Sequence, residues 1–290
     1  MHEKLVRTAE RLASLGERPA PEPPDEVNAA MIRNWTQALG DTRDWGDEAP
    51  PAMAQVWSMQ GLGAAKNGTA AAEVLRMLDD GGYTGVLGTD CEHSYDRPAR
   101  LGERLRATMR FGDVTGPKKT AMGEGYFVTW YESWYSGEER IAEMLFRVLK
   151  FRPAQPSPEP SPDFLRPAPA SVPVPRSDWP PLALPLTPTF VISTAIATRD
   201  FTPVHHDVAL ARAQGSQDIF LNILTTMGLV QRYVLENEPD AALASVKVRL
   251  GAPAYAGDTL TFTATRDGDT VEVLGTVSLG AHVKAAVTLR

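Results

Sequence analysis

The chain has one cysteine, no apolar run long enough to cross a membrane, and no excess of basic residues. Cys91 is the only cysteine, so no disulfide can form within the chain, and we expect it to be buried as a small apolar residue. No run approaches the roughly 20 apolar residues of a membrane span, and residues 1–12 lack the apolar stretch of a signal peptide. The formal net charge of −7 disfavours nucleic acid as a partner. These features predict a cytoplasmic globular protein that acts without a membrane or nucleic acid.

Proline is concentrated in one part of the chain, from Pro153 to Pro188. No helix or central strand tolerates that density, because proline fixes φ and removes a hydrogen-bond donor. We therefore expect an extended linker over residues 153–185. It would separate a first domain, residues 1–152, from a second domain, residues 186–290.

One short motif occurs once in each half. Residues 98–105 read Pro-Ala-Arg-Leu-Gly-Glu-Arg-Leu, and residues 253–260 read Pro-Ala-Tyr-Ala-Gly-Asp-Thr-Leu. Both fit the pattern Pro-Ala-x-x-Gly-acid-x-Leu and lead into alternating apolar and polar residues. Because the two copies lie at comparable places, they predict a duplicated fold.

Each half is expected to contain a helix followed by antiparallel strands. Helical spacing occurs at residues 219–236, where Asp218 could cap the first turn, and at residues 70–78, which Gly81 and Gly82 follow. The segments with the alternation of β-strands are residues 105–111, 125–134, 141–151, 190–196, 260–265, 271–277 and 283–289. A helix wrapped by a curved antiparallel sheet fits this order, so the predicted fold class is α+β. Two such units could pair their sheets edge to edge.

The segment with the strongest chemical signal is residues 198–207, Thr-Arg-Asp-Phe-Thr-Pro-Val-His-His-Asp. Asp200 and His205 are five residues apart, and Pro203 stiffens the loop between them, so both side chains could address one water molecule. Alternatively, Asp200 and His205 could bond to each other as a structural pair that closes a turn. A metal site that uses His205 and His206 would need a third ligand, which the sequence does not indicate. Asp207 is expected to cap a helix at residues 208–213.

This segment resembles the Asp-x-Asn-Pro-aliphatic-His-x-acid pattern of MaoC-like (R)-specific enoyl-CoA hydratases. The matching residues are Asp200, Pro203, Val204, His205 and Asp207, and Thr202 replaces the asparagine of the pattern. The resemblance implies a hot-dog fold in each half and hydration of a trans-2-enoyl-CoA thioester, with Asp200 and His205 as the catalytic residues.

The first half lacks this pair. Counting back from Gly102 places the corresponding stretch near residues 48–53, where no histidine follows. It is therefore expected to be a degenerate, non-catalytic hot-dog domain. Within the family, the chain resembles a fused form of the two-subunit actinobacterial steroid side-chain enoyl-CoA hydratases, through residues 88–134 for one subunit and residues 218–233 for the other. That resemblance implies a bulky acyl group.

The same resemblance implies further properties of the site. It requires no metal or other cofactor, because coenzyme A belongs to the substrate. The backbone N–H of Asn222 is a candidate oxyanion donor. Candidate substrate- and coenzyme A-binding residues are Arg199, Thr202, Pro203, Lys247 and Arg249, with Lys284 beside them; ordinary surface charge is the alternative for the basic ones. A homodimer of double hot dogs and an association with a downstream aldolase- or thiolase-type enzyme are the expected partners.

Two other functions remain open at this stage. Hot-dog thioesterases use a carboxylate on the central helix, but here only Asp218 precedes that helix. A non-catalytic acyl-CoA-binding scaffold would not require Asp200 and His205. In the first half, Glu92 and His93 are expected at a surface or interface. The large aromatic residues between Tyr126 and Tyr135 could line an acyl tunnel or pack on both faces of a strand.

Overall fold

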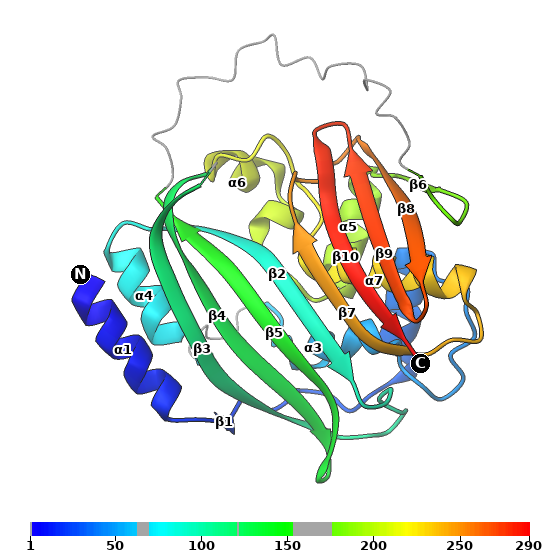
Figure 1. The fold of residues 1–290 in the computed structure, drawn as a ribbon, viewed down its shortest axis with the longest axis horizontal. Coiled ribbons are helices and arrows are strands. Elements are labelled where there is room, and N and C mark those ends of the chain that lie inside the picture. Colours follow the sequence, from blue (N-terminus) through cyan, green and yellow to red (C-terminus); the bar gives the residue numbers. More distant parts are fainter. Residues whose placement is uncertain (1, 63–69, 121, 153–175) are drawn as a thin grey trace.

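The computed structural model describes residues 2–62, 70–120, 122–152 and 176–290. Their strands form one antiparallel ten-stranded sheet with the order β1-β3-β4-β5-β2-β7-β10-β9-β8-β6 (Figure 1). The strands are β1 Arg18–Pro19, β2 Gly85–Tyr95, β3 Leu105–Thr120, β4 Gly123–Ser136, β5 Glu139–Phe151, β6 Leu182–Pro185, β7 Leu243–Leu250, β8 Thr259–Asp267, β9 Thr270–Val277 and β10 Gly280–Leu289. With helices packed against this sheet, the predicted α+β class is confirmed.

The two halves meet at the β2–β7 pair. This pair runs antiparallel from Asp90, opposite Arg249, to Ser94, opposite Ser245. The predicted edge-to-edge pairing is therefore confirmed, and it uses the backbone groups of two edges that would otherwise be exposed. Neither β2 nor β7 was among the strands expected from the sequence.

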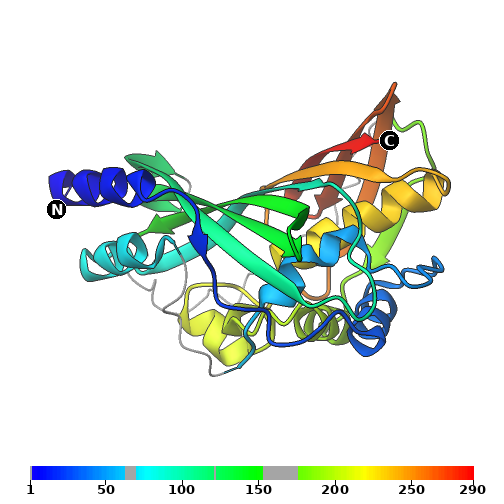
Figure 2. The same ribbon diagram turned by 90° about the horizontal axis from the view of Figure 1, so that it is seen from below.

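The helices are α1 His2–Ser14, α2 Ala29–Leu39, α3 Ala54–Ser58, α4 Ala72–Asp80, α5 Pro188–Ala197, α6 Val208–Ala213 and α7 Ile223–Asn237, with 3-10 turns η1 Pro51–Met53 and η2 Pro203–His205. Helices α2, α3, α5 and α7 lie on one side of the sheet (Figure 2). Helix α7 is the central helix of the second half, and of residues 223–235 only Arg232 is not buried. No helix of the described residues is long and apolar enough to span a membrane.

Three predicted elements differ in the structure. Residues 190–196 form part of helix α5 and not a strand, because Thr187 caps the first turn at Phe190 N and Pro188 occupies the first helical position. Helix α7 begins at Ile223 and not at residue 219, since its cap is Asn222 and not Asp218. The predicted linker ends earlier than residue 185, because β6 pairs with β8. Residues 153–175, where the rest of the linker was predicted, lie outside the described residues.

The predicted duplication is confirmed by matching hydrogen bonds. In each copy of the repeated motif the glycine has a positive φ, 82° at Gly102 and 85° at Gly257. Gly102 N donates to Val27 O, and Gly257 N donates to Leu186 O. Isolated bridges join Glu48 to Arg100 in the first half and Phe220 to Tyr255 in the second, at equivalent places in the motif.

These equivalences identify the central helix of the first half. Since Glu48 corresponds to Phe220, the counterpart of α7 begins at Pro51 and consists of η1 and α3. The predicted helix near residues 70–78 exists as α4, but it is not this counterpart. The three residues of η1 and the five of α3 span about 14 Å together, against about 22 Å for the 15 residues of α7. The inner face of the first-half sheet therefore extends well beyond its central helix.

The aromatic residues of β4 occupy both faces of the sheet. Tyr126, Trp130 and Trp134 are buried in the core. On the outer face, Tyr131 packs beneath Arg110 at 3.4 Å and Tyr135 beneath Arg106 at 4.1 Å. This alternation supports the packing interpretation of the aromatic run.

The neighbouring strand β2 also alternates. Cys91 is buried, as predicted, and Glu92 points outward. His93 is only 2% exposed, so its predicted place at a surface is wrong; its strand position directs it into the core.

Candidate active site

Asp200 is positioned by the end of helix α5. Asp200 N donates to Ala195 O and Arg199 N donates to Ile196 O, the two hydrogen bonds of a Schellman motif. Arg199 occupies the left-handed position of this motif with φ 56°, and no other described residue except glycine has a positive φ. This sharp reversal turns the Asp200 side chain back toward the loop that follows.

The Asp200 carboxylate is held by that loop. Its Oδ1 accepts hydrogen bonds from Thr202 Oγ1 at 2.7 Å and from Thr202 N at 3.2 Å. Thr202, which stands where the family pattern has asparagine, therefore holds the carboxylate through both its hydroxyl and its backbone N–H. With Oδ1 occupied, Oδ2 remains available for chemistry.

His205 ends the 3-10 turn that Pro203 begins. Its Nδ1 lies 2.8 Å from Phe220 O, and since a carbonyl oxygen only accepts, Nδ1 carries the proton. In the neutral imidazole Nε2 is then unprotonated, and it lies 3.5 Å from Asp200 Oδ2. The imidazole also makes an edge-to-face contact with the Phe220 ring, at a centroid distance of 5.0 Å. Tautomer and ring orientation are thus both fixed by Phe220.

Two acceptors therefore face each other across the site, a carboxylate oxygen and an imidazole nitrogen. They cannot hydrogen-bond directly in this protonation state, but a water molecule could donate one O–H to each. The Asp200 side chain is 14% exposed and the His205 side chain 10%, so such a water would be largely shielded from solvent. The structure thus brings the predicted pair together in a geometry suited to acid–base chemistry on water.

Asn222 connects this pair to the central helix. Its Oδ1 accepts from Thr225 N at 2.7 Å and caps α7, while its Nδ2 donates to Thr198 Oγ1 at 2.7 Å, two residues before Asp200. The side chain thus fixes the α7 N-terminus against the turn that carries Asp200. Sequence reasoning missed this contact, although asparagine before an apolar run is a recognised N-cap signal.

The first half contains a partial copy of the site at a different place from the one predicted. Helix α2 ends in the same motif as α5, with Gly40 at φ 66° and Asp41 N donating to Thr36 O, so Asp41 corresponds to Asp200. At the same offset, Gly46 stands where the second half has His205. The prediction near residues 48–53 was displaced because 56 positions separate Gly46 from Gly102, whereas 52 separate His205 from Gly257.

Asp41 has a structural partner in place of a catalytic one. Its Oδ1 accepts from Arg43 N, as Asp200 Oδ1 accepts from Thr202 N, but its Oδ2 accepts from Trp45 Nε1 at 3.0 Å. The oxygen that faces the imidazole in the second half is therefore occupied by an indole N–H in the first.

Of the basic residues considered for coenzyme A binding, only Arg199 is close to Asp200 and His205, since it directly precedes Asp200. Its guanidinium pairs with Asp25 at 3.3 Å. Lys247 and Arg249 point to the outer face of β7, where they pair with Glu92 and Asp90, both at 3.4 Å. Lys284 is exposed on the adjacent strand β10.

The neighbouring polar residues have local partners. His206 Nε2 lies 3.0 Å from Phe201 O, and Asp207 caps α6 at Leu210 N, as predicted. Within the described ranges, no group of three or more His, Cys, Asp and Glu side chains is arranged to hold a metal ion.

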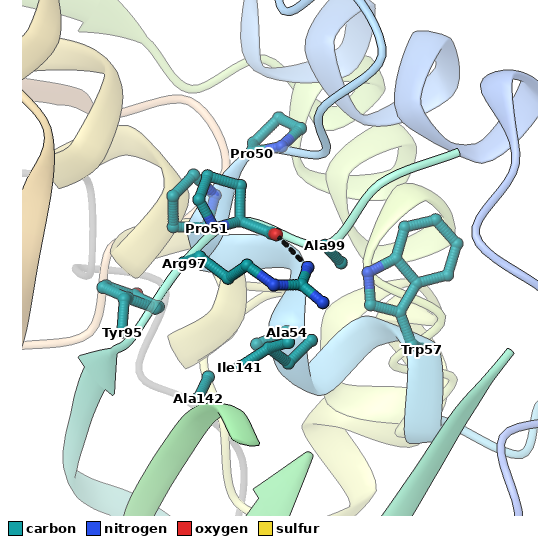
Figure 3. Close-up of a pocket in the computed structure, with 10 residues that line it drawn as sticks. Pro50, Pro51, Ala54, Trp57, Tyr95, Arg97, Ala99, Ile141 and Ala142 are labelled. Carbon is teal, nitrogen blue, oxygen red and sulfur yellow. Dashed lines mark hydrogen bonds between the residues drawn. The ribbon is translucent and has the colours of Figure 1, made fainter. Parts of the chain in front are cut away.

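A small cavity of about 10 Å³ lies in the first half, beneath η1 and α3. Figure 3 shows Trp57 and Ala54 on one side and Tyr95 and Ala142 of the sheet nearby; the Arg97 guanidinium hydrogen-bonds to Pro98 O. Its volume corresponds to about one water molecule, so it is no acyl-binding tunnel as it stands.

Comparisons with known proteins agree with this geometry. Residues 177–286, which include Asp200 and His205, match the MaoC like domain. The chain is 42% identical over 157 residues to the 3-oxo-4,17-pregnadiene-20-carboxyl-CoA hydratase alpha subunit of Mycobacterium tuberculosis, covering 49% of this chain and 50% of that protein. It is 56% identical over 116 residues to the beta subunit of the same hydratase, covering 38% of this chain and 90% of that subunit.

The overall fold also has a solved counterpart. A MaoC-like dehydratase from Phytophthora capsici superposes with a TM-score of 0.71 at 14% identity, over 97% of both chains. The chain spans about half the length of the alpha subunit and nearly all of the beta subunit. By its match to the beta subunit, its matching domain and its double hot-dog fold, the chain belongs to the MaoC-like family.

Proposed function

We propose that this protein is an enoyl-CoA hydratase that adds water to a trans-2-enoyl-CoA thioester and forms a 3-hydroxyacyl-CoA. The observation that carries the proposal is the pair of facing acceptors, Asp200 Oδ2 and His205 Nε2, 3.5 Å apart. Support comes from the MaoC-like domain around them and from relatives named as hydratases.

In this mechanism, one water donates a hydrogen bond to each acceptor. Asp200 takes a proton from the water as its oxygen attacks the β-carbon. The proton passes to His205 Nε2 and from there to the α-carbon, so that one water is added across the double bond. The Phe220 carbonyl holds Nδ1–H throughout and stabilises the transient imidazolium. The thioester serves as the electron sink, so the reaction needs no metal or redox cofactor.

Negative charge that develops on the thioester oxygen requires hydrogen-bond donors. The N-terminus of α7 offers backbone N–H groups and the positive end of the helix dipole. The N–H of Thr225 is already used by the Asn222 side chain. We propose the backbone N–H of Asn222, with those of Ile223 and Leu224, as donors to this oxygen.

We also propose a bulky, ring-bearing acyl group. The names of the two relatives specify a steroid thioester, and their alpha and beta subunits would correspond to the two halves of this chain. A homodimer, an aldolase- or thiolase-type partner and a cytoplasmic location belong to the same proposal.

Arg199 offers a first test of coenzyme A binding. Arg199→Gly places glycine where the left-handed backbone favours it, and removes an ion pair worth at most about 1 kcal/mol, so we expect the free energy of unfolding to change by about 1 kcal/mol or less. If the guanidinium binds a phosphate of coenzyme A, KM should rise about tenfold because charged hydrogen bonds are lost. Thermal unfolding and steady-state kinetics measure both quantities.

The control for this variant is Asp25→Asn, which frees Arg199 from its ion pair without removing the guanidinium. It should leave KM unchanged or lower it. An unchanged KM in Arg199→Gly would remove Arg199 from the coenzyme A site.

The activity itself is tested by following the loss of the conjugated enoyl-thioester absorbance. Enoyl-CoAs from crotonyl-CoA to a steroid-ring thioester are mixed with the protein, and free thiol is measured in parallel. Loss of absorbance without thiol release is the expected result. Thiol release would favour a thioesterase, although α7 has no Asp or Glu before Glu236. Binding without turnover of any thioester would favour the scaffold.

A further inference from the structure

Strand β10 carries a bulge that directs His282 into the core of the second half. Ala281 pairs with Thr276 and Val283 pairs with Gly275, so the pairing of β10 with β9 skips His282. A bulge lets consecutive side chains point to the same face, and both His282 and Val283 are buried. The imidazole is only 2% exposed and reaches the start of helix α7.

Two hydrogen bonds fix the tautomer of His282. Its Nδ1 lies 2.8 Å from Ala252 O, and its Nε2 lies 2.9 Å from Thr226 Oγ1. A carbonyl oxygen only accepts, so Nδ1 carries the proton and the neutral imidazole accepts from the Thr226 hydroxyl at Nε2. Burial lowers the pKa of His282, although the hydrogen bond to Ala252 raises it, and the neutral form is therefore favoured. The hydroxyl also lies 3.1 Å from Asn222 O, but that carbonyl already accepts from Thr226 N.

The Thr226 contact continues to the turn that carries Asp200. Thr226 is fully buried at the start of α7, and its N–H donates to Asn222 O at 3.1 Å. The Asn222 side chain donates in turn to Thr198 Oγ1 at 2.7 Å, two residues before Asp200. A continuous series of buried contacts thus runs from His282 on β10, through the start of α7, to the end of α5.

The Ala252 contact leads toward His205. Two residues beyond Ala252, the carbonyl of Ala254 accepts at 3.1 Å from the backbone N–H that follows Phe220. Phe220 O is the group that lies against Nδ1 of His205. By holding Ala252, His282 therefore also anchors the short segment on which the orientation of His205 depends.

The first half has an apolar residue at the place of His282. The pairing of β5 with β4 skips Ile141, as that of β10 with β9 skips His282. Ile141 O accepts from Asp96 N at 2.9 Å, and His282 O accepts from Gly251 N at 2.7 Å. Both donors lie two residues before the proline of the repeated motif. Ile141 is therefore the counterpart of His282.

The counterpart of Thr226 is apolar as well. Thr226 and Ala54 each lie six residues beyond the isolated bridge residue that precedes the central helix of their half. Ala54 and Ile141 line the same small cavity (Figure 3). A hot-dog unit thus forms with two apolar residues at this place, so the fold by itself does not require the polar pair of Thr226 and His282. The pair occurs in the half that contains Asp200.

We propose that His282 is a positioning residue of the hydratase. Through Thr226 it fixes the start of α7, where the proposed donors to the thioester oxygen lie. Through Ala252 it fixes the segment that holds Phe220. This inference rests on the proposed function, and it adds a residue outside residues 198–207 on which the rate depends. The donors act when charge develops on the thioester oxygen, so a displaced helix start lowers kcat and leaves KM nearly unchanged.

The test transfers the first-half pair into the second half. The double variant Thr226→Ala/His282→Ile removes the donor and the acceptor of their hydrogen bond together, which limits the loss of stability. Thr226→Val removes the hydroxyl at nearly the same shape, and Thr226→Ser keeps it. Thr225→Val is the matched control, because the Thr225 hydroxyl is equally buried and has no hydrogen-bond partner among the described residues.

Three measurements are made on each protein. Steady-state hydration of crotonyl-CoA gives kcat and KM, and thermal unfolding tests the fold. The imidazole ¹⁵N resonances of His205 in histidine-labelled protein report the environment of that ring without turnover. The double variant and Thr226→Val should lose about tenfold or more in kcat, keep KM within about twofold, and shift the His205 resonances. Thr226→Ser and Thr225→Val should stay within about threefold of the wild-type kcat.

A role in stability alone predicts a different result. An unchanged kcat in the folded double variant and in Thr226→Val would overturn the inference, and so would equal losses in Thr226→Val and Thr225→Val. If the double variant does not fold, Thr226→Val decides by the same criteria. Absence of turnover in the wild type would count against the hydratase, and the His205 resonances would then decide whether His282 positions this site.

Discussion

Asp200→Asn should lower kcat about a thousandfold and leave the fold intact. The amide has nearly the shape of the carboxylate, and its oxygen can still accept the hydrogen bonds from Thr202. It cannot accept a proton from water, so the attacking oxygen loses its base. Loss of enoyl-thioester absorbance under substrate saturation measures kcat, and thermal unfolding tests the fold.

The chain supplies its own control for this variant. Asp41 occupies the same place at the end of α2 and makes the same kind of turn, but its second oxygen is bonded to Trp45. Asp41→Asn should therefore leave kcat within about twofold of the wild-type value. Equal losses in the two variants would mean that the carboxylate has only a structural role. Full activity of Asp200→Asn would eliminate it as the base.

His205→Gln should lower kcat about a hundredfold or more, because glutamine cannot carry the proton to the α-carbon. Its amide N–H could still donate to Phe220 O, so the loop should stay folded. The double variant Asp200→Asn/His205→Gln should be little slower than Asp200→Asn alone. Two groups that handle one proton act as a unit, and their effects do not add. Steady-state kinetics of the four proteins gives this cycle directly.

His206 is the control for His205. It is the next residue in the chain, but its Nε2 hydrogen-bonds to Phe201 O and not to Asp200. His206→Gln should keep kcat within about twofold of the wild-type value. Strictly additive losses in the Asp200–His205 cycle would contradict a shared water and indicate two independent roles.

The two halves share structural features, but only the second half has both the aspartate and the histidine of the candidate site. Both halves keep the glycine of the repeated motif and the capped helix that precedes the Asp. The first half has Gly46 in place of the histidine and a central helix of only η1 and α3. At the start of that helix Pro50 stands where the second half has Asn222, and it makes no side-chain capping hydrogen bond.

The candidate pair and most strands could be predicted from the sequence, because those signals are local. Alternation predicts β3, β4, β5, β8, β9 and β10 without knowledge of their neighbours. The spacing of Asp200, Pro203 and His205 within one short loop indicates the pair, since a stiff connection limits where the two side chains can lie. The capping role of Asp207 follows from its place before an apolar segment.

Other features depended on contacts between distant parts of the chain. Residues 190–196 alternate like a strand, yet the Thr187 cap and packing against α2 make them helical. The ion-pair partners of Lys247 and Arg249 lie on β2, so they follow only from the pairing of β7 with β2. Asp41 could be matched to Asp200 only through hydrogen bonds, because 61 positions separate Asp41 from Gly102 and only 57 separate Asp200 from Gly257.

The sequence by itself therefore determined the alternating strands, the repeated motif and the loop that carries Asp200 and His205, all of which are specified within about ten consecutive residues. Only the tertiary structure decided which nitrogen of His205 faces Asp200, because the carbonyl of Phe220, 15 residues away, holds the other one. It also decided that His282 on β10 contacts Thr226 on α7, since the two residues are 56 positions apart and no local pattern relates them.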